Sequence, residues 1–150
     1  MTTIENAVLD DIPQLCELLT LLFQQETDFQ PDVEKQCRGL SWIIERPEVG
    51  SIIVLREGPI VLGMVNVLYT VSTACGGRVA IVEDMVVRPG SRNRGLGSLM
   101  IRRAIEFAGS AGCLRITLLT DRTNDSAIRF YQRHGFAPSG MIPFRLLLKQ

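Results

Sequence analysis

The spacing of apolar residues over residues 10–47 predicts two amphipathic helices. Asp11 and Pro13 favour a helix start, as do Pro31 and Asp32, and Pro47 ends the second pattern. Between these boundaries apolar residues recur every three or four positions, the period that places them on one face of a helix. The first helix is expected to bury Ile12, Leu15, Cys16, Leu19, Leu22 and Phe23, and the second Val33, Cys37, Leu40 and Ile44.

Runs of β-branched residues predict strands on either side of these helices. A short strand is expected over residues 2–8. Ser51–Arg56 and Ile60–Thr70 flank the turn-forming sequence Glu-Gly-Pro at residues 57–59, and this arrangement predicts a hairpin. The first half of the chain therefore predicts a strand, two helices and two antiparallel strands.

The second half alternates between strand and helix. A strand over Val79–Val87 is followed by a basic turn, a helix from Leu96 to Ala111, and a strand over Leu114–Thr120. Two strands joined by a helix run parallel, with a right-handed crossover. A short helix over Asn124–His134 and a last strand over Phe144–Leu148 complete an α/β arrangement with helices on both faces of a mixed sheet. At 150 residues, the chain is expected to be a single domain, residues 1–150.

The basic turn has the properties of an anion-binding site. It reads Arg-Pro-Gly-Ser-Arg-Asn-Arg-Gly-Leu-Gly from Arg88 to Gly97, directly before a predicted helix. The first N–H groups of a helix lack partners and carry a partial positive charge, so they stabilise an anion such as phosphate. Glycine at positions 95 and 97 allows close approach of the backbone and positive φ angles.

Two common phosphate-binding motifs do not fit this turn. A Walker A loop needs Lys and Ser or Thr where the chain has Leu96 and Gly97. A dinucleotide fingerprint needs a third glycine where the chain has Met100. The sequence therefore argues against a P-loop nucleotide site and a Rossmann site.

The segment Arg92-Asn93-Arg94-Gly95-Leu96-Gly97 resembles the acyl-CoA signature of the GNAT acyltransferase superfamily, Gln/Arg-x-x-Gly-x-Gly/Ala. The preceding strand Ile81–Val87 and the downstream Asn-x-x-Ala-x-x-Phe-Tyr pattern, which ends at Tyr131, resemble the family as well. One departure is Asn93, where glycine is frequent in the family, but Asn tolerates left-handed backbone angles. The resemblance implies a mostly antiparallel, twisted sheet of about six to seven strands.

The resemblance implies acetyl-CoA as cosubstrate, with its pyrophosphate on backbone N–H groups of residues 92–97. The backbone of Met85–Val87 would pair with the pantothenate arm, while the side chains of these residues pack in the core. Asn124 would contact CoA, a role that can coexist with an N-cap. The side chains of Arg88, Arg92 and Arg94 would add charge-assisted contacts to phosphate oxygens, although a solvent-facing role that serves solubility fits Arg88 equally well. The implied cofactor-binding residues are Met85, Val86, Val87, Arg92, Asn93, Arg94, Gly95, Leu96, Gly97, Ser98, Asn124 and Phe130.

Two residues are candidates for proton transfer. Tyr131 matches the family tyrosine that protonates the departing CoA thiolate, although a helical Tyr can also be only a core residue. Glu83 is the candidate general base, with a structural hydrogen bond as the alternative. Strand alternation is expected to place Glu83 with Met85 and Val87 on one face and Asp84 on the other. No metal site is expected, since His134 is the only histidine and no ligand set surrounds it.

Composition narrows the setting. No basic stripe interleaved with aromatic residues indicates nucleic-acid binding, and no apolar stretch approaches the ~20 residues of a membrane span. No signal peptide is apparent, so a cytoplasmic location is expected. The four cysteines form no Cys-x-x-Cys pair and are expected to be buried thiols.

The expected function is N-acetylation of a primary amine of a small molecule, by direct attack on acetyl-CoA. Residues 1–35 contain eight acidic residues and one basic residue, and this excess favours a small cationic amine as acceptor. The alternatives are a protein or peptide acetyltransferase and a noncatalytic acyl-CoA-binding regulatory module. Dimers are common in the family, so the resemblance is compatible with a homodimer.

Overall fold

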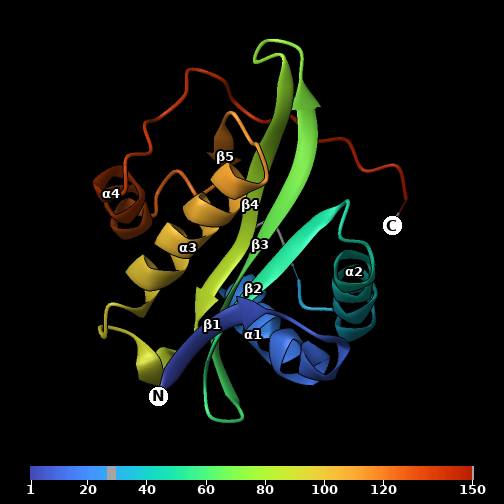
Figure 1. The fold of residues 1–150 in the computed structure, drawn as a ribbon, viewed down its shortest axis with the longest axis vertical. Helices are drawn as coiled ribbons and strands as arrows, with labels where there is room; N and C mark the ends of the chain where they lie inside the picture. Colours follow the sequence, from blue (N-terminus) through green and yellow to red (C-terminus); the bar gives the residue numbers. More distant parts are fainter. Residues whose placement is uncertain (27–29, 150) are drawn as a thin grey trace.

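A five-stranded sheet forms the centre of the protein, in a computed structural model that describes residues 1–26 and 30–149 (Figure 1). The strand order is β1-β2-β3-β4-β5; the first four strands are antiparallel, and β5 runs parallel to β4 as expected. The strands are β1 (Thr2–Asn6), β2 (Gly50–Glu57), β3 (Ile60–Ser72), β4 (Gly77–Val87) and β5 (Ile116–Leu118). The helices are α1 (Ile12–Gln25), α2 (Val33–Glu45), α3 (Leu96–Ser110) and α4 (Asp125–Arg133), with short 3-10 turns η1 (Leu9–Asp11) and η2 (Pro89–Ser91).

Helices cover both faces of the sheet, which confirms the expected class of fold. In Figure 1, α1 and α2 lie on one side of the sheet and α3 and α4 on the other. Leu15, Leu18 and Leu40 of the first pair are almost completely buried against β2, β3 and β4. Ala104 and Ala108 of α3 are completely buried against the opposite face. Each fully buried leucine contributes about 1.5–3 kcal/mol. Val33, by contrast, was expected in the core and is 58% exposed.

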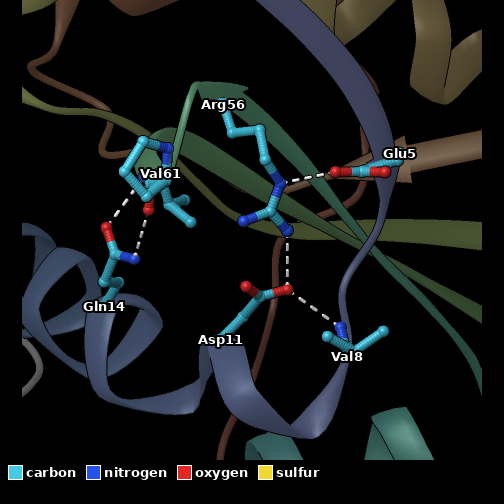
Figure 2. Close-up of polar contacts among 7 residues, drawn as sticks. Glu5, Val8, Asp11, Gln14, Arg56 and Val61 are labelled. Carbon is cyan, nitrogen blue, oxygen red and sulfur yellow. Dashed lines mark hydrogen bonds and ion pairs between the residues drawn. The ribbon is translucent and has the colours of Figure 1, made fainter.

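A polar network attaches the start of α1 to the sheet (Figure 2). Arg56 of β2 donates to Glu5 of β1 through Nε, and its Nη2 donates to Asp11 Oδ2 at 2.8 Å. Asp11 Oδ2 also accepts from the backbone N–H of Val8 at 2.9 Å. Gln14 accepts from the N–H of Val61 at 2.8 Å. These contacts fix the N-terminal turn of α1 on the hairpin of β2 and β3.

A β-bulge in β4 changes which face its side chains occupy. Asn66 of β3 lies opposite Glu83 and Met64 lies opposite Val86, so two residues of β4, Asp84 and Met85, oppose one residue of β3. Asp84 has a φ of 54°. As a result, Val82 packs in the core under α3, whereas Val86, four residues later, packs under α1.

The bulge overturns the expected alternation of Glu83, Asp84 and Met85. Met85 and Val87 pack on the α3 side, while Glu83 lies opposite Asn66 and therefore shares its face. Asp84 hydrogen-bonds to Asn66 and so belongs to this face too. The prediction that Glu83 shares a face with Met85 and Val87, with Asp84 opposite, was wrong because the extra residue shifts the phase of the strand.

The expected last strand, Phe144–Leu148, is absent from the described part of the chain. This segment has an apolar, strand-like sequence, but a strand also needs the backbone of a neighbour, and β5 pairs only with β4 among the residues described. Phe144, Leu146 and Leu148 are 84–90% exposed. The sheet therefore has five strands in the described residues rather than six or seven.

Of the helices described, none has the length and apolar character needed to cross a membrane.

Candidate functional site

The basic turn leads into α3, which begins without a side-chain hydrogen bond from its N-cap. The N–H of Arg88 donates to the carbonyl of Leu62 at 2.6 Å and ends β4, and η2 follows. Asn93 and Gly95 both adopt left-handed angles, with φ values of 65° and 73°, which confirms that Asn tolerates this conformation. Gly95 is the N-cap of α3 and gives the helix no side-chain cap. The first N–H groups of α3 can therefore bind an anion.

The three arginines of the turn have different partners. Arg88 donates to the carbonyl of Val61 at 3.1 Å and pairs with Glu17 of α1 at 3.3 Å, so its side chain joins strand to helix. Arg92 Nε donates to the carbonyl of Val87 at 3.3 Å. Arg94 pairs with Glu57 at 2.9 Å, and both side chains are nearly half exposed. Arg92 and Arg94 thus remain at the surface of the turn, whereas the Arg88 side chain contacts β3 and α1.

The backbone of β4 is open on one side beyond Val82. The ladder with β5 joins Ala80–Val82 to Ile116–Leu118, while β4 continues to Val87 with pairing only to β3 among the described residues. Residues 83–87 thus have no strand partner on this edge among the described residues, although the Val87 carbonyl accepts from Arg92, and the edge can accept an extended ligand as an added strand. The side chain of Val86 is buried, and those of Met85 and Val87 pack on core residues, as expected.

Helix α4 borders this open segment. The hydroxyl of Tyr131 lies 3.9 Å from Met85 Sδ, and the Phe130 ring lies 3.5 Å from the position that a Cβ on Gly97 would take. His134 Nε2 lies 3.0 Å from Ser98 Oγ in the first turn of α3. Asn124 is the N-cap of α4 and accepts from the N–H of Ala127 at 3.1 Å. Burial, followed by the charge of Glu26, raises the pKa of Tyr131, so its hydroxyl keeps its proton at neutral pH.

A second polar group lies beside the open segment, on the α1 face of the sheet. Asn66 Nδ2 donates to Asp84 Oδ2 at 2.8 Å. Asn66 is 3% exposed, and its Oδ1 is buried without a hydrogen-bond partner among the described residues. Leaving such an acceptor unpaired costs about 1–3 kcal/mol. Burial and the charge of Glu83 raise the pKa of Asp84 to about 6, against the lowering effect of the hydrogen bond from Asn66.

Sequence reasoning missed the Asn66–Asp84 pair. A signal was present in Asn66, a polar residue within the apolar run of β3, because a buried amide requires partners. Glu83, the residue expected to act as base, is exposed. The structure thus gathers the turn at residues 92–97, the open edge of β4 and Tyr131 in one region, with Asp84 and Asn66 adjoining it.

Comparison with known proteins identifies the family. Residues 12–136 match the model of the acetyltransferase (GNAT) family. That match covers most of the chain, so the protein belongs to the GNAT family.

Individual relatives agree with this assignment. The chain is 29% identical over 135 residues to the uncharacterized N-acetyltransferase MJ1207 of Methanocaldococcus jannaschii, covering 89% of this chain and 60% of the relative. It is 26% identical over 136 residues to the aminoalkylphosphonate N-acetyltransferase of Salmonella typhimurium, covering 91% and 85%. A predicted acetyltransferase of Clostridium acetobutylicum, solved with acetyl-CoA, superposes with a TM-score of 0.79 at 17% identity, covering 99% and 97%; this likeness shows the fold alone.

Proposed function

We propose that the protein transfers the acetyl group of acetyl-CoA to the primary amine of a small molecule. The observation that carries this proposal is the edge of β4 without a strand partner among the described residues, next to the N terminus of α3, where the N-cap Gly95 provides no side-chain hydrogen bond. An extended ligand that ends in phosphate groups matches both features, because it can pair with a strand edge and place its anion at a helix start. Acetyl-CoA supplies an activated acyl group as a thioester.

The residues of the turn bind and orient this cosubstrate. The N–H groups of residues 92–97 are proposed to hold the pyrophosphate, with the Arg92 and Arg94 side chains adding charge-assisted hydrogen bonds at the surface. The side chain of Leu96 is buried, so its contribution comes from the backbone. Ser98, Phe130 and Asn124 lie on α3 and α4 and are proposed to contact the ligand from that side.

Tyr131 is proposed to donate a proton to the thiolate that leaves when the amine attacks the thioester carbonyl. Its raised pKa keeps the hydroxyl protonated, and the contact with Met85 places it against the β4 segment. A backbone N–H near Met85 would stabilise the negative charge on the thioester oxygen. A carboxylate of the same β4 segment, which contains Glu83 and Asp84, is proposed to accept the proton of the incoming ammonium.

The acceptor is proposed to be a small cationic amine. The region near Tyr131 includes the negative charge of Glu26, and the β4 segment adds Glu83 and Asp84. Asp28, which contributes to the acidic excess of residues 1–35, lies outside the described residues. The Salmonella relative is named for an amine that also carries a phosphonate, and acetylation of such amines by this protein is the competing expectation.

An amine panel with free CoA thiol as the readout tests this proposal. The panel contains polyamines, aminoglycosides, aminoalkylphosphonates, amino-sugar phosphates and lysine peptides, each with acetyl-CoA. Turnover of polyamines or aminoglycosides above the other amines supports the cationic acceptor. Turnover confined to peptides indicates the protein-acetylating alternative. Binding of acetyl-CoA with no turnover of any amine indicates a noncatalytic acyl-CoA-binding module.

A further inference from the structure

The bulge in β4 holds a carboxylate in a position that a regular strand would not give it. The backbone of Asp84 is in the left-handed region, with a φ of 54°. Asp adopts this conformation more readily than most residues other than glycine. The bulge turns Asp84 toward Asn66, whose amide fixes one carboxylate oxygen at 2.8 Å. Bulges of this kind re-aim side chains and recur beside active sites.

The Asn66–Asp84 pair offers two acceptors to one incoming group. The carboxylate of Asp84 accepts hydrogen bonds, and the buried Oδ1 of Asn66 has no partner among the described residues. A buried amide carbonyl without a partner among the described residues, next to a half-buried carboxylate, is suited to a ligand that brings several N–H donors. A primary ammonium group has three.

The pair and Tyr131 lie on opposite faces of the same β4 segment. Asn66 and Asp84 occupy the face covered by α1, since Met64 and Val86 pack in the core under that helix. Met85, which contacts Tyr131, faces the α3 side. A proton acceptor on one face and a proton donor on the other suit a reaction in which the nucleophile loses a proton and the leaving group gains one.

We propose that the Asn66–Asp84 pair receives the ammonium group of the acceptor, with Asp84 as the proton acceptor and Asn66 as a substrate-binding residue that also orients Asp84. This inference rests on the proposed acetyl transfer. One N–H proton passes from the ammonium to Asp84, and the nitrogen lone pair that is released attacks the thioester carbonyl. Asn66 Oδ1 accepts a hydrogen bond from one of the remaining N–H groups. Glu83 then acts through its charge and not as the base.

The groups that act on Asp84 set the expected pH dependence. Glu83 on the same strand raises the pKa of Asp84, and Asn66 on β3 lowers it. Helix α1 covers this face, and its titratable groups interact with other residues: Glu17 pairs with Arg88, Cys16 contacts Cys37, and the charge of Glu26 acts on Tyr131. Asp84 must be ionised to accept a proton, so kcat/KM for the amine should fall as the pH drops through about 6.

The fall of kcat/KM at low pH, which is the acid limb of the pH–rate profile, tests whether Asp84 or Glu83 is the base. E83Q removes a charge that raises the pKa of Asp84, so its acid limb should remain and move to lower pH. N66A removes a hydrogen bond that lowers this pKa, so its limb should move to higher pH, with a higher KM for the amine. D84N should lose the limb and about 10²-fold or more in kcat/KM at neutral pH. Equal Kd values for acetyl-CoA in all variants show that the cosubstrate site is intact.

Several outcomes would overturn the assignment. If E83Q loses the acid limb while D84N keeps it, Glu83 is the base. If wild type shows no acid limb between about pH 5 and 8, no carboxylate with the properties of Asp84 takes part. If D84N does not fold, the direction of the E83Q shift still decides the question. Absence of turnover in wild type with every amine refutes acetyl transfer itself, a failure distinct from that of this pair.

A different observation concerns two cysteines in the helices that cover the same face. Cys16 Sγ of α1 lies 2.9 Å from Cys37 Sγ of α2, and both are free thiols. Gln36 of α2 donates to the carbonyl of Cys16 at 3.2 Å and to Thr20 Oγ1 at 3.1 Å, and so holds the two helices together. A disulfide needs a sulfur separation of about 2.05 Å, so bond formation requires only a small movement.

We also propose that Cys16 and Cys37 form a reversible disulfide with a small-molecule disulfide as oxidant. Cys37 is half-buried and lines a surface hollow of about 600 Å³. Its thiolate attacks the oxidant, which forms a mixed disulfide and releases one thiol. Cys16 then attacks the Cys37 sulfur, loses its proton to solvent and releases the second thiol. Cys16 is the slower partner, because burial and the neighbouring Cys37 raise its pKa to about 12.

Mass spectrometry after treatment with oxidised glutathione tests this site. In wild type, two free thiols should become one disulfide, so the mass should fall by two hydrogens with no glutathione retained. Digestion should give one cross-linked peptide pair containing Cys16 and Cys37. C16S should retain a glutathione adduct on Cys37, since nothing resolves the mixed disulfide. A stable adduct on Cys37 in wild type, or a cross-link that involves Cys75 or Cys113, would overturn the proposal.

Discussion

Tyr131 of α4 and Met85 of β4 are in contact, with the phenolic oxygen 3.9 Å from the thioether sulfur. The two residues are 46 positions apart in the sequence, and their contact brings the proposed proton donor to the strand whose edge is open. This placement makes Tyr131 the residue whose removal is most informative about the chemistry.

Replacement of Tyr131 by Phe should lower kcat by about 10²-fold, because the thiolate would leave without a proton donor. The KM for acetyl-CoA should change little, since the ring is retained. Y69F is the matched control: Tyr69 is the other tyrosine, and it stacks on Phe107 under α3 with ring centroids 6.3 Å apart. An unchanged kcat in Y131F at saturating amine would show that Tyr131 is not the acid.

Replacement of Gly95 by Ala should weaken acetyl-CoA binding and destabilise the fold. At the φ of 73° that Gly95 adopts, a Cβ costs about 1–2 kcal/mol. A shift of the backbone to relieve this cost would redirect the amides at the start of α3. We expect a Kd increase of about tenfold, which corresponds to about 1.4 kcal/mol, measured by titration calorimetry.

Two further variants control the Gly95 measurement. G95N should bind acetyl-CoA better than G95A, because Asn tolerates left-handed angles. G109A lies within α3 with open space around it and should stabilise the protein by about 0.5–1 kcal/mol. If G95A binds acetyl-CoA as tightly as wild type, the backbone geometry at this position does not matter for the ligand.

Asp11 should contribute stability that is lost in acid. Burial alone would raise the pKa of Asp11, but hydrogen bonds from Arg56 and from the N–H of Val8, and the charge of Arg56, lower it below its usual value. A lowered native pKa means that the contribution is complete above the pKa of the unfolded state, about 3.9, and is lost as the pH falls through the native pKa. Urea unfolding between pH 2 and 7 measures this dependence.

D11N should lower the free energy of unfolding at pH 7 by about 1–3 kcal/mol, and should flatten its dependence on pH below about 4. E5Q is the matched control, because Glu5 also pairs with Arg56 but its side chain is 52% exposed; it should cost less than about 1 kcal/mol. Equal effects of D11N and E5Q would contradict the importance of the buried contact.

The sequence predicted the parts of the site that depend on local patterns. The turn at residues 92–97 is encoded by Gly95, by Asn93 with its tolerance for left-handed angles, and by the helical spacing that follows. The starts of α3 and α4 could be predicted for the same reason, since Gly95 and Asn124 are N-caps that stand directly before the helical pattern. Both helices form as expected.

Features that depend on contacts between distant segments were not predicted. The bulge at Asp84 needs no glycine, so the strand appeared regular, and only its pairing with β3 shows the shift in phase. The partnership of Asp84 with Asn66 joins residues 18 positions apart. The segment Phe144–Leu148 has a strand-like sequence, but that pattern does not specify which backbone it pairs with, and the described segment pairs with none.

The central claim is acetyl transfer to an amine, and product stoichiometry tests it most directly. Wild-type protein is incubated with acetyl-CoA and the best amine of the panel, and free CoA thiol and N-acetylated amine are quantified together by mass spectrometry. We predict equal amounts of both products, formed over many turnovers and suppressed in Y131F but not in Y69F. Tight binding of acetyl-CoA without acetylated amine, or release of CoA with acetate as the only product, would contradict the account.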